Sequence, residues 1–423
     1  DLADYSRFIQ AKASSIQARL VLYHWNQQDQ YLELQQKQLH NHFSEALSQQ
    51  LRQLEAQHYK DADDISQRFP ELSELFETTP TEITQIKSSI PAGTVVIQPV
   101  SLPHSVAIFV LSKEHLNVVQ TPVTSTKFDQ LLSNYLEQLQ DDSKDNYIET
   151  GGRPIYDILI RPIEKQIQAL SPKQLSIIAT DKLRSLPFET LYDKTTQRFL
   201  IQNYPINYLT RISTRSLQSS QLSHLQPQKT ILLAFGNPLP SPQLLLGAEN
   251  EINQITHFFP GSQAYVGKDA TLAHFKAQAY RFPFIHLATH GCFQDHDCQK
   301  FKLKQNTLLF ADNIQFNLAD AALLGLKGTQ LLTLAACQTA QETKSSTEGI
   351  VNVAYIFERA GAQAVMASLW AADDKATQQL MIDFYKNLQH GMTKAQALQH
   401  AKLNQLDRHP YFWSSFILIG DAY

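Results

Sequence analysis

The sequence predicts a layered α/β protein, with two lobes of strands and helices that follow an N-terminal helical arm. Three observations support this fold class. Short β-branched runs alternate with amphipathic stretches from Thr94 onward. The same alternation begins again at Thr230, after a polar stretch rich in Ser and Gln. Two runs in the second half are continuously apolar, which is typical of parallel strands covered on both faces.

The composition fits a folded protein and argues against several classes of partner. The chain has 423 residues, of which 43% are hydrophobic and 18% charged, enough for two or three domains. With 36 Lys and Arg against 40 Asp and Glu, the net charge is -4, so we expect neither a nucleic-acid nor a membrane partner. Polar residues interrupt the most apolar stretch, residues 349–372, so we expect no membrane-spanning helix.

The cysteines and the first residue bear on location and completeness. The three cysteines, Cys292, Cys298 and Cys337, are too few and too close together to cross-link such a chain, so we expect a reducing compartment, the cytoplasm. The chain begins at Asp1 with neither an initiator Met nor a signal-peptide pattern. We therefore expect it to be part of a longer protein.

Residues 1–88 are predicted to form the helical arm. They are rich in Gln, Leu, Ala and His, and an apolar row with helical spacing runs from Leu39 to Leu54. No tetratricopeptide repeat is visible, so any such array would precede Asp1. An apolar stripe must be buried, so we expect the arm or upstream repeats to bind a regulatory protein, or the arm to pack against the lobes. The break at Ser89–Gly93 ends the arm.

The first lobe, residues 89–228, is predicted to alternate strands and helices and to end in the polar linker Ser213–Lys229. Its strands are expected at Thr94–Val100, Ser105–Leu111, Leu116–Val123 and Leu175–Thr180, and its helices at Lys127–Leu139 and Tyr156–Leu170.

The second lobe, residues 229–423, repeats the alternation. Strands are expected at Thr230–Phe235, Phe284–Ala288, Gln330–Ala335, Gln363–Leu369 and Phe416–Ile419, and helices at Ala248–Phe259, Ile350–Ala360, Lys375–Leu388 and Thr393–Leu406.

Two candidate catalytic residues directly follow the two continuously apolar strands. His290 and Gly291 follow Phe284–Ala288, and Cys337 follows Gln330–Ala335. Because the carboxyl ends of parallel strands meet at one edge of a sheet, the imidazole can take the thiol proton. Caspases place the His at a comparable distance before the Cys. The sequence therefore predicts a Cys/His dyad, with the N–H groups of Gly291 and Cys337 as the oxyanion hole.

Other interpretations of nearby residues remain open. Five residues in one segment, His286, His290, Cys292, His296 and Cys298, are of types that bind zinc, but their spacing does not match a zinc site. We expect Cys292 and Cys298 to be loop thiols and His286 to be a hydrogen-bonded core histidine. Neither a metal nor a cofactor is expected.

Further motifs surround the dyad: Leu186–Glu189, Tyr204–Ile206, Glu348–Gly349, Ala360–Ala362, Ala367–Trp370, Asp373–Asp374, His409–Tyr411, Trp413 and Phe416–Asp421. Together with His286–Gly291 and Leu334–Thr339, they resemble the CHAT family, caspase-like cysteine peptidases that are common in bacteria and usually attached to tetratricopeptide repeats. The resemblance extends from about Ile90, and it implies a caspase-like fold with a non-catalytic first lobe and a catalytic second lobe. Gln338 stands where the family often has Glu, and Ala372 where it often has Val.

Two acids, Asp373 and Asp374, precede the helix expected from Lys375, where Asp is a favoured cap. In separases, which are relatives of the family, an acid four positions after the Trp of Leu-Trp lies in the pocket for a basic residue. Asp374 has that position relative to Trp370. The resemblance thus implies a P1 pocket formed by Asp374, Asp373 and Trp370, and cleavage after Arg or Lys. We expect the carboxylate of the pocket acid, Asp374 first and Asp373 second, to be buried or half-buried. A helix cap without a pocket role is the alternative.

The function predicted from the sequence is that of a cytoplasmic cysteine endopeptidase, acting on protein substrates in a regulatory or signalling role. The main alternative is a non-catalytic CHAT scaffold that binds signalling partners. An esterase or other acyl transferase would use the same dyad chemistry, and the family resemblance disfavours it.

Overall fold

The computed structural model describes residues 87–209, 231–292, 298, 302–304, 306–335, 353–354, 356–358, 360–370 and 373–423. Nearly all of the predicted arm, the whole predicted linker Ser213–Lys229 and Cys337 lie outside the described residues. The described residues belong to one compact unit, Ile83–Tyr423.

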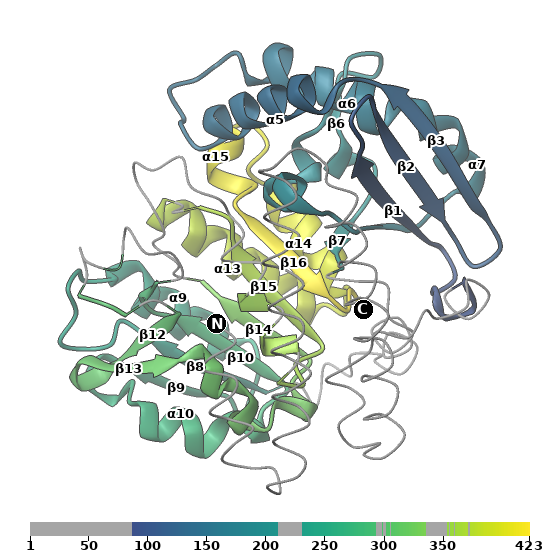
Figure 1. The fold of residues 1–423 in the computed structure, drawn as a ribbon. Coiled ribbons are helices and arrows are strands. Elements are labelled where there is room, and N and C mark those ends of the chain that lie inside the picture. Colours follow the sequence, from purple (N-terminus) through teal and green to yellow (C-terminus); the bar gives the residue numbers. More distant parts are fainter. Residues whose placement is uncertain are drawn as a thin grey trace, which may run out of the picture. The chain divides into compact units, whose positions relative to one another are not determined.

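A single mixed sheet of eleven strands runs through the described part of the chain (Figure 1), in the order β3-β2-β1-β4-β7-β16-β15-β14-β10-β8-β9. Its first half contains β1 Thr94–Ser101, β2 Ser105–Leu111, β3 Leu116–Pro122, β4 Gln174–Ile177 and β7 Ile206–Tyr208. Its second half contains β8 Leu232–Gly236, β9 Gln263–Val266, β10 Phe284–Ala288, β14 Leu331–Leu334, β15 Ala364–Ser368 and β16 Phe416–Gly420. The layered α/β prediction is confirmed.

Helices and two smaller sheets complete the fold. The α-helices are α5 Ser125–Leu139, α6 Arg153–Leu159, α7 Glu164–Leu170, α9 Leu246–His257, α10 Leu272–Gln278, α13 Asp374–Gln389, α14 Lys394–Leu403 and α15 Pro410–Trp413. The smaller sheets pair β11 Gly291–Cys292, β12 Thr307–Phe310 and β13 Ile314–Asn317, and β5 Tyr192–Asp193 with β6 Arg198–Phe199.

The helix expected at Tyr156–Leu170 is interrupted. Helix α6 ends at Leu159, a 3-10 turn covers Arg161–Ile163, and α7 starts at Glu164. Pro162 has no N–H to donate and its ring clashes with the preceding turn, so a continuous α-helix cannot pass through it. The prediction of one helix was wrong for this reason.

The sheet is covered on both faces, because side chains alternate along each strand. On β10, Phe284 and Ala288 face α9, α13 and α14, and belong to one buried apolar cluster. Ile285 and Leu287 face the opposite side, where α5, α6 and α10 contribute to a second cluster. Strands β10 and β14 are buried along their whole length, as their continuous apolar runs predict.

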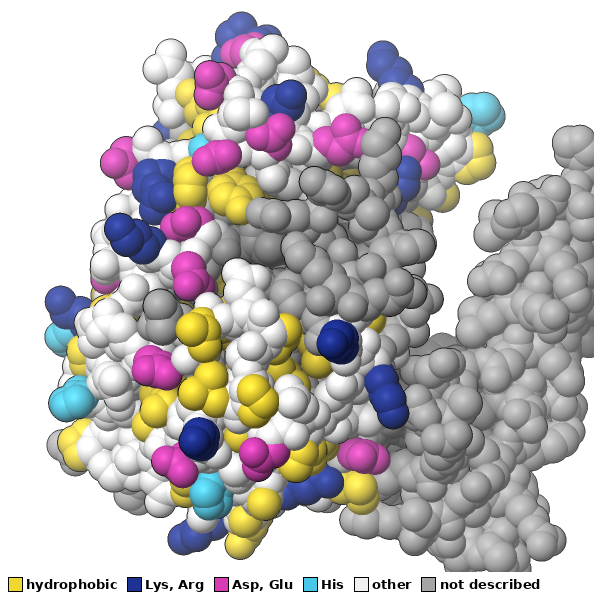
Figure 2. Space-filling model, turned by 90° about the vertical axis from the view of Figure 1, so that its left-hand side faces the viewer, with side chains coloured by type: hydrophobic (Ala, Val, Ile, Leu, Met, Phe, Trp, Pro, Cys, Tyr) yellow, Lys and Arg dark blue, Asp and Glu magenta, His cyan; other side chains and the backbone are white. Residues whose placement is uncertain are grey.

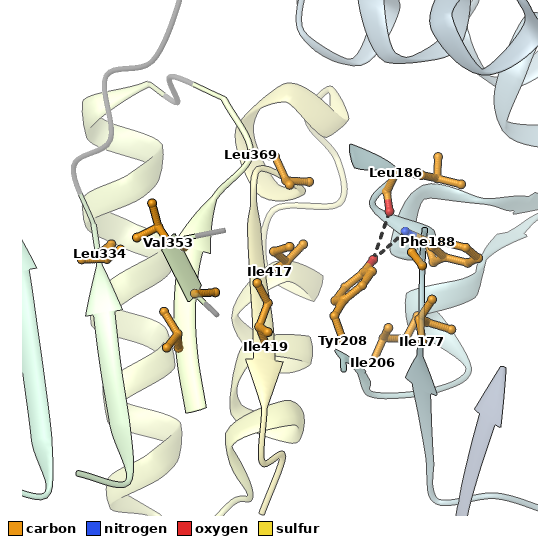
Figure 3. Close-up of a cluster of buried hydrophobic side chains, with 14 of the residues drawn as sticks. Ile177, Leu186, Phe188, Ile206, Tyr208, Leu334, Val353, Leu369, Ile417 and Ile419 are labelled. Atoms are coloured by element: carbon orange, nitrogen blue, oxygen red, sulfur yellow. Dashed lines mark hydrogen bonds between the residues drawn. The ribbon is translucent and has the colours of Figure 1, made fainter. Parts of the chain in front are cut away.

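The two halves of the sheet join where β7 pairs in parallel with β16, at Ile419 and Tyr208. Figure 3 shows the buried side chains of this junction, with Tyr208 from β7 facing Ile417 and Ile419 of β16. Two further bonds cross it: Asn207 Nδ2 donates to the Gly420 carbonyl at 2.7 Å, and Gln399 Nε2 to the Ile201 carbonyl at 2.6 Å. The lobe boundary at residues 228 and 229 stays a prediction.

Candidate active site

The strands that lead to the predicted dyad are neighbours. β10 pairs in parallel with β14, and Ala335 N–H extends the pairing by donating to the Leu287 carbonyl at 3.0 Å. His290 follows Ala288 by two residues, and Cys337 follows Ala335 by two. The strand arrangement is therefore confirmed. Cys337 lies outside the described residues, so its approach to His290 stays a prediction.

A backbone carbonyl fixes the orientation of the His290 ring. Nε2 of His290 lies 2.7 Å from the carbonyl oxygen of Gln243, which also accepts a hydrogen bond from the Ser241 hydroxyl at 2.5 Å. A carbonyl only accepts, so Nε2 carries the proton and Nδ1 carries the lone pair of the neutral ring. The sequence reasoning missed Gln243, since a main-chain oxygen leaves no residue-type signal.

The loop that carries Gln243 follows β8 and is held in place by Asn237. The Asn237 side chain accepts from Leu245 N–H at 2.9 Å and donates to Glu249 Oε1 at 2.8 Å. Its own N–H donates to the Ala288 carbonyl at 3.1 Å, at the end of β10. Asn237 has φ 44°, a left-handed conformation that Asn tolerates better than most residues. The loop and the strand before His290 are thereby connected directly.

His290 is enclosed by protein, with 1% of its surface exposed. Burial lowers its pKa below the ordinary value, while the hydrogen bond to Gln243 and the charge of Asp374 act in the opposite direction. The imidazole is therefore neutral at neutral pH. A neutral ring with its lone pair on Nδ1 is the form that a general base requires.

Gly291 is held against β12 by its neighbours. Thr289 Oγ1 donates to the Leu309 carbonyl at 2.5 Å, and Leu309 N–H donates to the His290 carbonyl at 2.8 Å. Bonded and non-bonded pairs alternate along an antiparallel ladder, so the pair Gly291 and Leu308 is a non-bonded one. The N–H of Gly291 therefore points away from β12.

The predicted pocket residues have three different environments. Asp373 caps α13 and accepts from Ala376 N–H at 2.9 Å. Asp374 is exposed, and an added Cβ at Gly247 in α9 would lie 3.1 Å from its Oδ2. Trp370 is buried, and its Nε1 donates to the Tyr411 carbonyl at 3.1 Å. The expected buried or half-buried carboxylate is thus wrong for Asp374, because the first turn of α13 projects it beyond the packed core.

Cys292 and Cys298 are not the loop thiols that the sequence predicts. A disulfide joins them, with a Cα–Cα distance of 5.4 Å, and both are buried against Leu303 and Leu309. Spacing alone could not show this pairing, because a disulfide depends on the distance and direction between the two side chains in the fold. Within the described ranges, no cluster of three or more His, Cys, Asp or Glu side chains could hold a metal ion.

The surface charges on one face of the described residues are mixed. On the face drawn in Figure 2, Lys and Arg side chains are distributed among Asp and Glu side chains, and no continuous basic patch is visible there. Among the helices that the structure describes, none combines the length and apolarity needed to cross a bilayer.

The sequence model of the CHAT domain matches residues 149–421, more than half of the chain. The chain belongs to the CHAT domain family. All of the predicted site residues lie within the matched range, whereas β1, β2, β3 and α5 precede it.

Curated relatives of this CHAT protein include tetratricopeptide repeat protein 28 of Homo sapiens, 24% identical over 350 residues, which are 69% of this chain and 14% of the relative. The Mus musculus protein of the same name is 24% identical over 333 residues, 63% of this chain and 13% of the relative. The chain thus spans about a seventh of these relatives.

Two solved structures are similar to this chain. Saccharomyces cerevisiae separase, in its complex with securin, is similar with a TM-score of 0.53 and 10% identity, over 80% of this chain and 30% of separase. The Arg-specific cysteine proteinase gingipain R is similar with a TM-score of 0.40 and 10% identity, over 70% of this chain and 75% of that chain. The likeness to separase identifies the CHAT fold of this chain as caspase-like.

Proposed function

We propose that this CHAT protein is a cysteine endopeptidase in which Cys337 is the nucleophile and His290 the general base and acid. The observation that carries the proposal is the orientation of His290. Its Nε2 is bound to the Gln243 carbonyl, so Nδ1 is the basic nitrogen, and it lies at the end of the strand beside the one that leads to Cys337. The family and the caspase-like fold support the same chemistry without deciding it.

The proposed reaction uses these groups in order. Nδ1 of His290 takes the proton of the Cys337 thiol, and Sγ attacks the scissile carbonyl carbon. The oxyanion accepts hydrogen bonds from the N–H groups of Gly291 and Cys337, and the proton on Nδ1 passes to the leaving amine. Water then loses a proton to Nδ1 and attacks the thioester. The carboxylic acid departs, and the thiol recovers its proton.

The test is turnover of a peptide library by wild type, Cys337→Ala and His290→Ala. We expect both variants to lose turnover by about three orders of magnitude or more while they melt like wild type, because the dyad acts as a unit. A wild type that cleaves nothing and is not labelled at Cys337 by a peptidyl electrophile would support the non-catalytic scaffold instead. Retained turnover in either variant would refute the assignment of the dyad.

We further propose that the enzyme cleaves after Arg or Lys, with Asp374 as the acid that recognises the basic side chain. Asp374 faces the first turn of α9, and its charge acts on His290. As an exposed group it would gain only about 1 kcal/mol from a surface ion pair, and more once the substrate covers the pair.

The measurement for this preference compares peptides with Arg and with citrulline, its neutral isostere, at P1. For Asp374→Asn, the ratio of kcat/KM between the two peptides should fall by about tenfold, which corresponds to about 1.4 kcal/mol. Asp373→Asn should lower stability and leave that ratio unchanged, since Asp373 caps α13. An unchanged kcat/KM ratio in Asp374→Asn would mean that neither acid recognises the substrate and that both only stabilise the N-terminus of α13.

The biological setting is also a proposal. The curated relatives are tetratricopeptide repeat proteins, which supports a protein partner bound through residues 1–88 or through repeats upstream. We infer a reducing compartment, the cytoplasm, because a thiol nucleophile must stay reduced. The disulfide between Cys292 and Cys298 argues in the other direction. Mass spectrometry of the protein alkylated in intact cells would distinguish a reducing from an oxidising compartment, since a reducing compartment leaves the Cys292 and Cys298 sulfurs alkylated.

A further inference from the structure

A chain of four buried polar side chains lies behind the strand ends of the candidate site. Glu251 Oε1 is 2.7 Å from His286 Nε2, and His286 Nδ1 is 3.2 Å from the Tyr385 hydroxyl. The Tyr385 hydroxyl donates to Thr333 Oγ1 at 2.9 Å. None of these side chains is more than 4% exposed. The surrounding cluster is otherwise made of apolar residues such as Phe284, which makes a polar chain there unusual.

The protons of this chain can be assigned from its donors. Because the single Tyr385 hydrogen goes to Thr333, the His286 contact to Tyr385 must be an Nδ1–H donor. Nε2 then shares one proton with Glu251, either as imidazolium and carboxylate or as neutral imidazole and carboxylic acid. The pair is neutral overall in both forms, which is the condition under which a buried pair is tolerated. Burial raises the pKa of Glu251 above its ordinary value, and the contact with His286 offsets only part of this rise.

Each of the four polar side chains lies on a helix or strand that carries, precedes or follows a candidate site residue. His286 is on β10, four residues before His290, and its register partner Thr333 is on β14, four residues before Cys337. Glu251 is on α9, which follows the Gln243 loop, and Tyr385 is on α13, which begins at Asp374. The charge of Asp374 acts on both Glu251 and His290.

We propose that Glu251, His286, Tyr385 and Thr333 form a positioning network that fixes β10 and β14 relative to α9 and α13, and so holds His290 in line with Cys337. A connected row of buried polar contacts favours few arrangements, whereas apolar contacts allow many of similar energy. The network touches no substrate and acts through the dyad. This inference rests on the proposed function.

The experiment measures the rate of Cys337 alkylation by iodoacetamide against pH, together with peptide turnover, in the full chain. Peptide mapping by mass spectrometry follows alkylation at Cys337 itself, so the signal does not depend on whether Cys292 and Cys298 are disulfide-bonded in solution. When the thiol proton passes to Nδ1 of His290, the thiolate lies beside an imidazolium, so a working dyad gives a midpoint below the value of about 8.5 for a free thiol. In Tyr385→Phe and Thr333→Val, we expect this midpoint to rise toward 8.5 and kcat to fall by about 10- to 100-fold, with KM within about twofold.

Two comparisons separate positioning from mere loss of stability. Tyr135→Phe removes an equally buried hydroxyl that bonds to Thr190 in the first lobe, and it should lower stability without moving the midpoint. At position 251, Glu251→Gln can donate its amide N–H to His286 Nε2 and should keep kcat within about threefold, whereas Glu251→Leu should lose it as Tyr385→Phe does.

The outcomes distinguish failure of the positioning role from failure of the proposed function. If the wild-type midpoint is low and stays low in Tyr385→Phe and Thr333→Val, the positioning role is overturned and the dyad stands. Equal kcat values in Glu251→Gln and Glu251→Leu would also overturn the positioning role. A wild-type midpoint near 8.5 without turnover refutes the proposed function, and the positioning role falls with it. If Tyr385→Phe does not fold, the pair of substitutions at Glu251 gives the same answer.

Discussion

The ion pair between Glu189 and Lys402 offers a strong test of how the two halves of the sheet are joined. Lys402 Nζ in α14 lies 2.7 Å from Glu189 Oε1, and the two side chains are 0% and 1% exposed. Tyr208 on β7 donates its hydroxyl to the other oxygen, Oε2, at 2.5 Å. Replacing Lys402 with Met keeps most of the aliphatic stem and leaves the Glu189 charge with Tyr208 as its remaining charge-stabilising contact.

The expected cost follows from that burial. Removing one partner of a fully buried pair costs about 3 to 5 kcal/mol, because a desolvated charge is left uncompensated. This is a large share of a typical unfolding free energy of about 5 to 15 kcal/mol. By contrast, Glu149→Gln breaks the exposed pair with Arg153, whose side chains are 58% and 32% exposed, and should cost about 1 kcal/mol or less.

Urea denaturation, followed by circular dichroism and by the fluorescence of buried Trp413, measures these differences. If the loss in Lys402→Met comes from the uncompensated charge, adding Glu189→Gln should restore most of it. If the loss comes from packing, the double variant should be no more stable than the single one. A cost below about 1 kcal/mol in Lys402→Met, comparable to that of Glu149→Gln, would refute the reasoning.

Three further predictions concern the site. Because burial lowers the pKa of His290, its neutral form persists below pH 6.5, so the acid limb of kcat/KM should lie below that pH, and a limb above pH 7 would contradict it. Gly247→Ala should lower kcat/KM about threefold for Arg peptides but not for citrulline peptides, because the added Cβ would crowd Asp374. The same substitution should raise the stability of α9 by up to about 1 kcal/mol, because Ala favours a helix more than Gly does. Cys292→Ser should lower the unfolding free energy by roughly 2 kcal/mol by opening the short loop to Cys298, and an unchanged urea midpoint would show the disulfide to be absent in solution.

The sequence was informative where one element carries its own pattern. The bounds of β2 and β10 agree with the predicted ranges, and the buried runs of β10 and β14 correctly indicated parallel strands that are covered on both faces. Strand β7 was missed, because its three residues show no periodicity and its pairing with β16 lies more than 200 residues away along the chain. Long-range pairing leaves no local signal.

In the candidate site, too, the sequence predicted the residues that follow a recognisable strand but not those brought in from elsewhere in the fold. His290 follows a readable strand, whereas the Gln243 carbonyl that orients it comes from a loop with no motif. The exposure of Asp374 depends on where α13 begins relative to the core, which residue types alone do not determine. The partners of His286 could not be named either, since Glu251 and Tyr385 come from helices on either side of it in sequence.

The two buried polar systems should therefore affect different properties. Glu189 and Lys402 connect the segment between β4 and β7 to α14, which contributes none of the predicted site residues, so their loss should lower stability while the remaining folded protein keeps its kcat. Tyr385 and Thr333 connect elements that carry or lead to site residues, so their loss should lower kcat in protein that is still folded. If Lys402→Met lowered kcat at urea concentrations well below its unfolding transition, the first lobe would have to act on the site directly. The predicted separation between a non-catalytic first lobe and a catalytic second lobe would then be wrong.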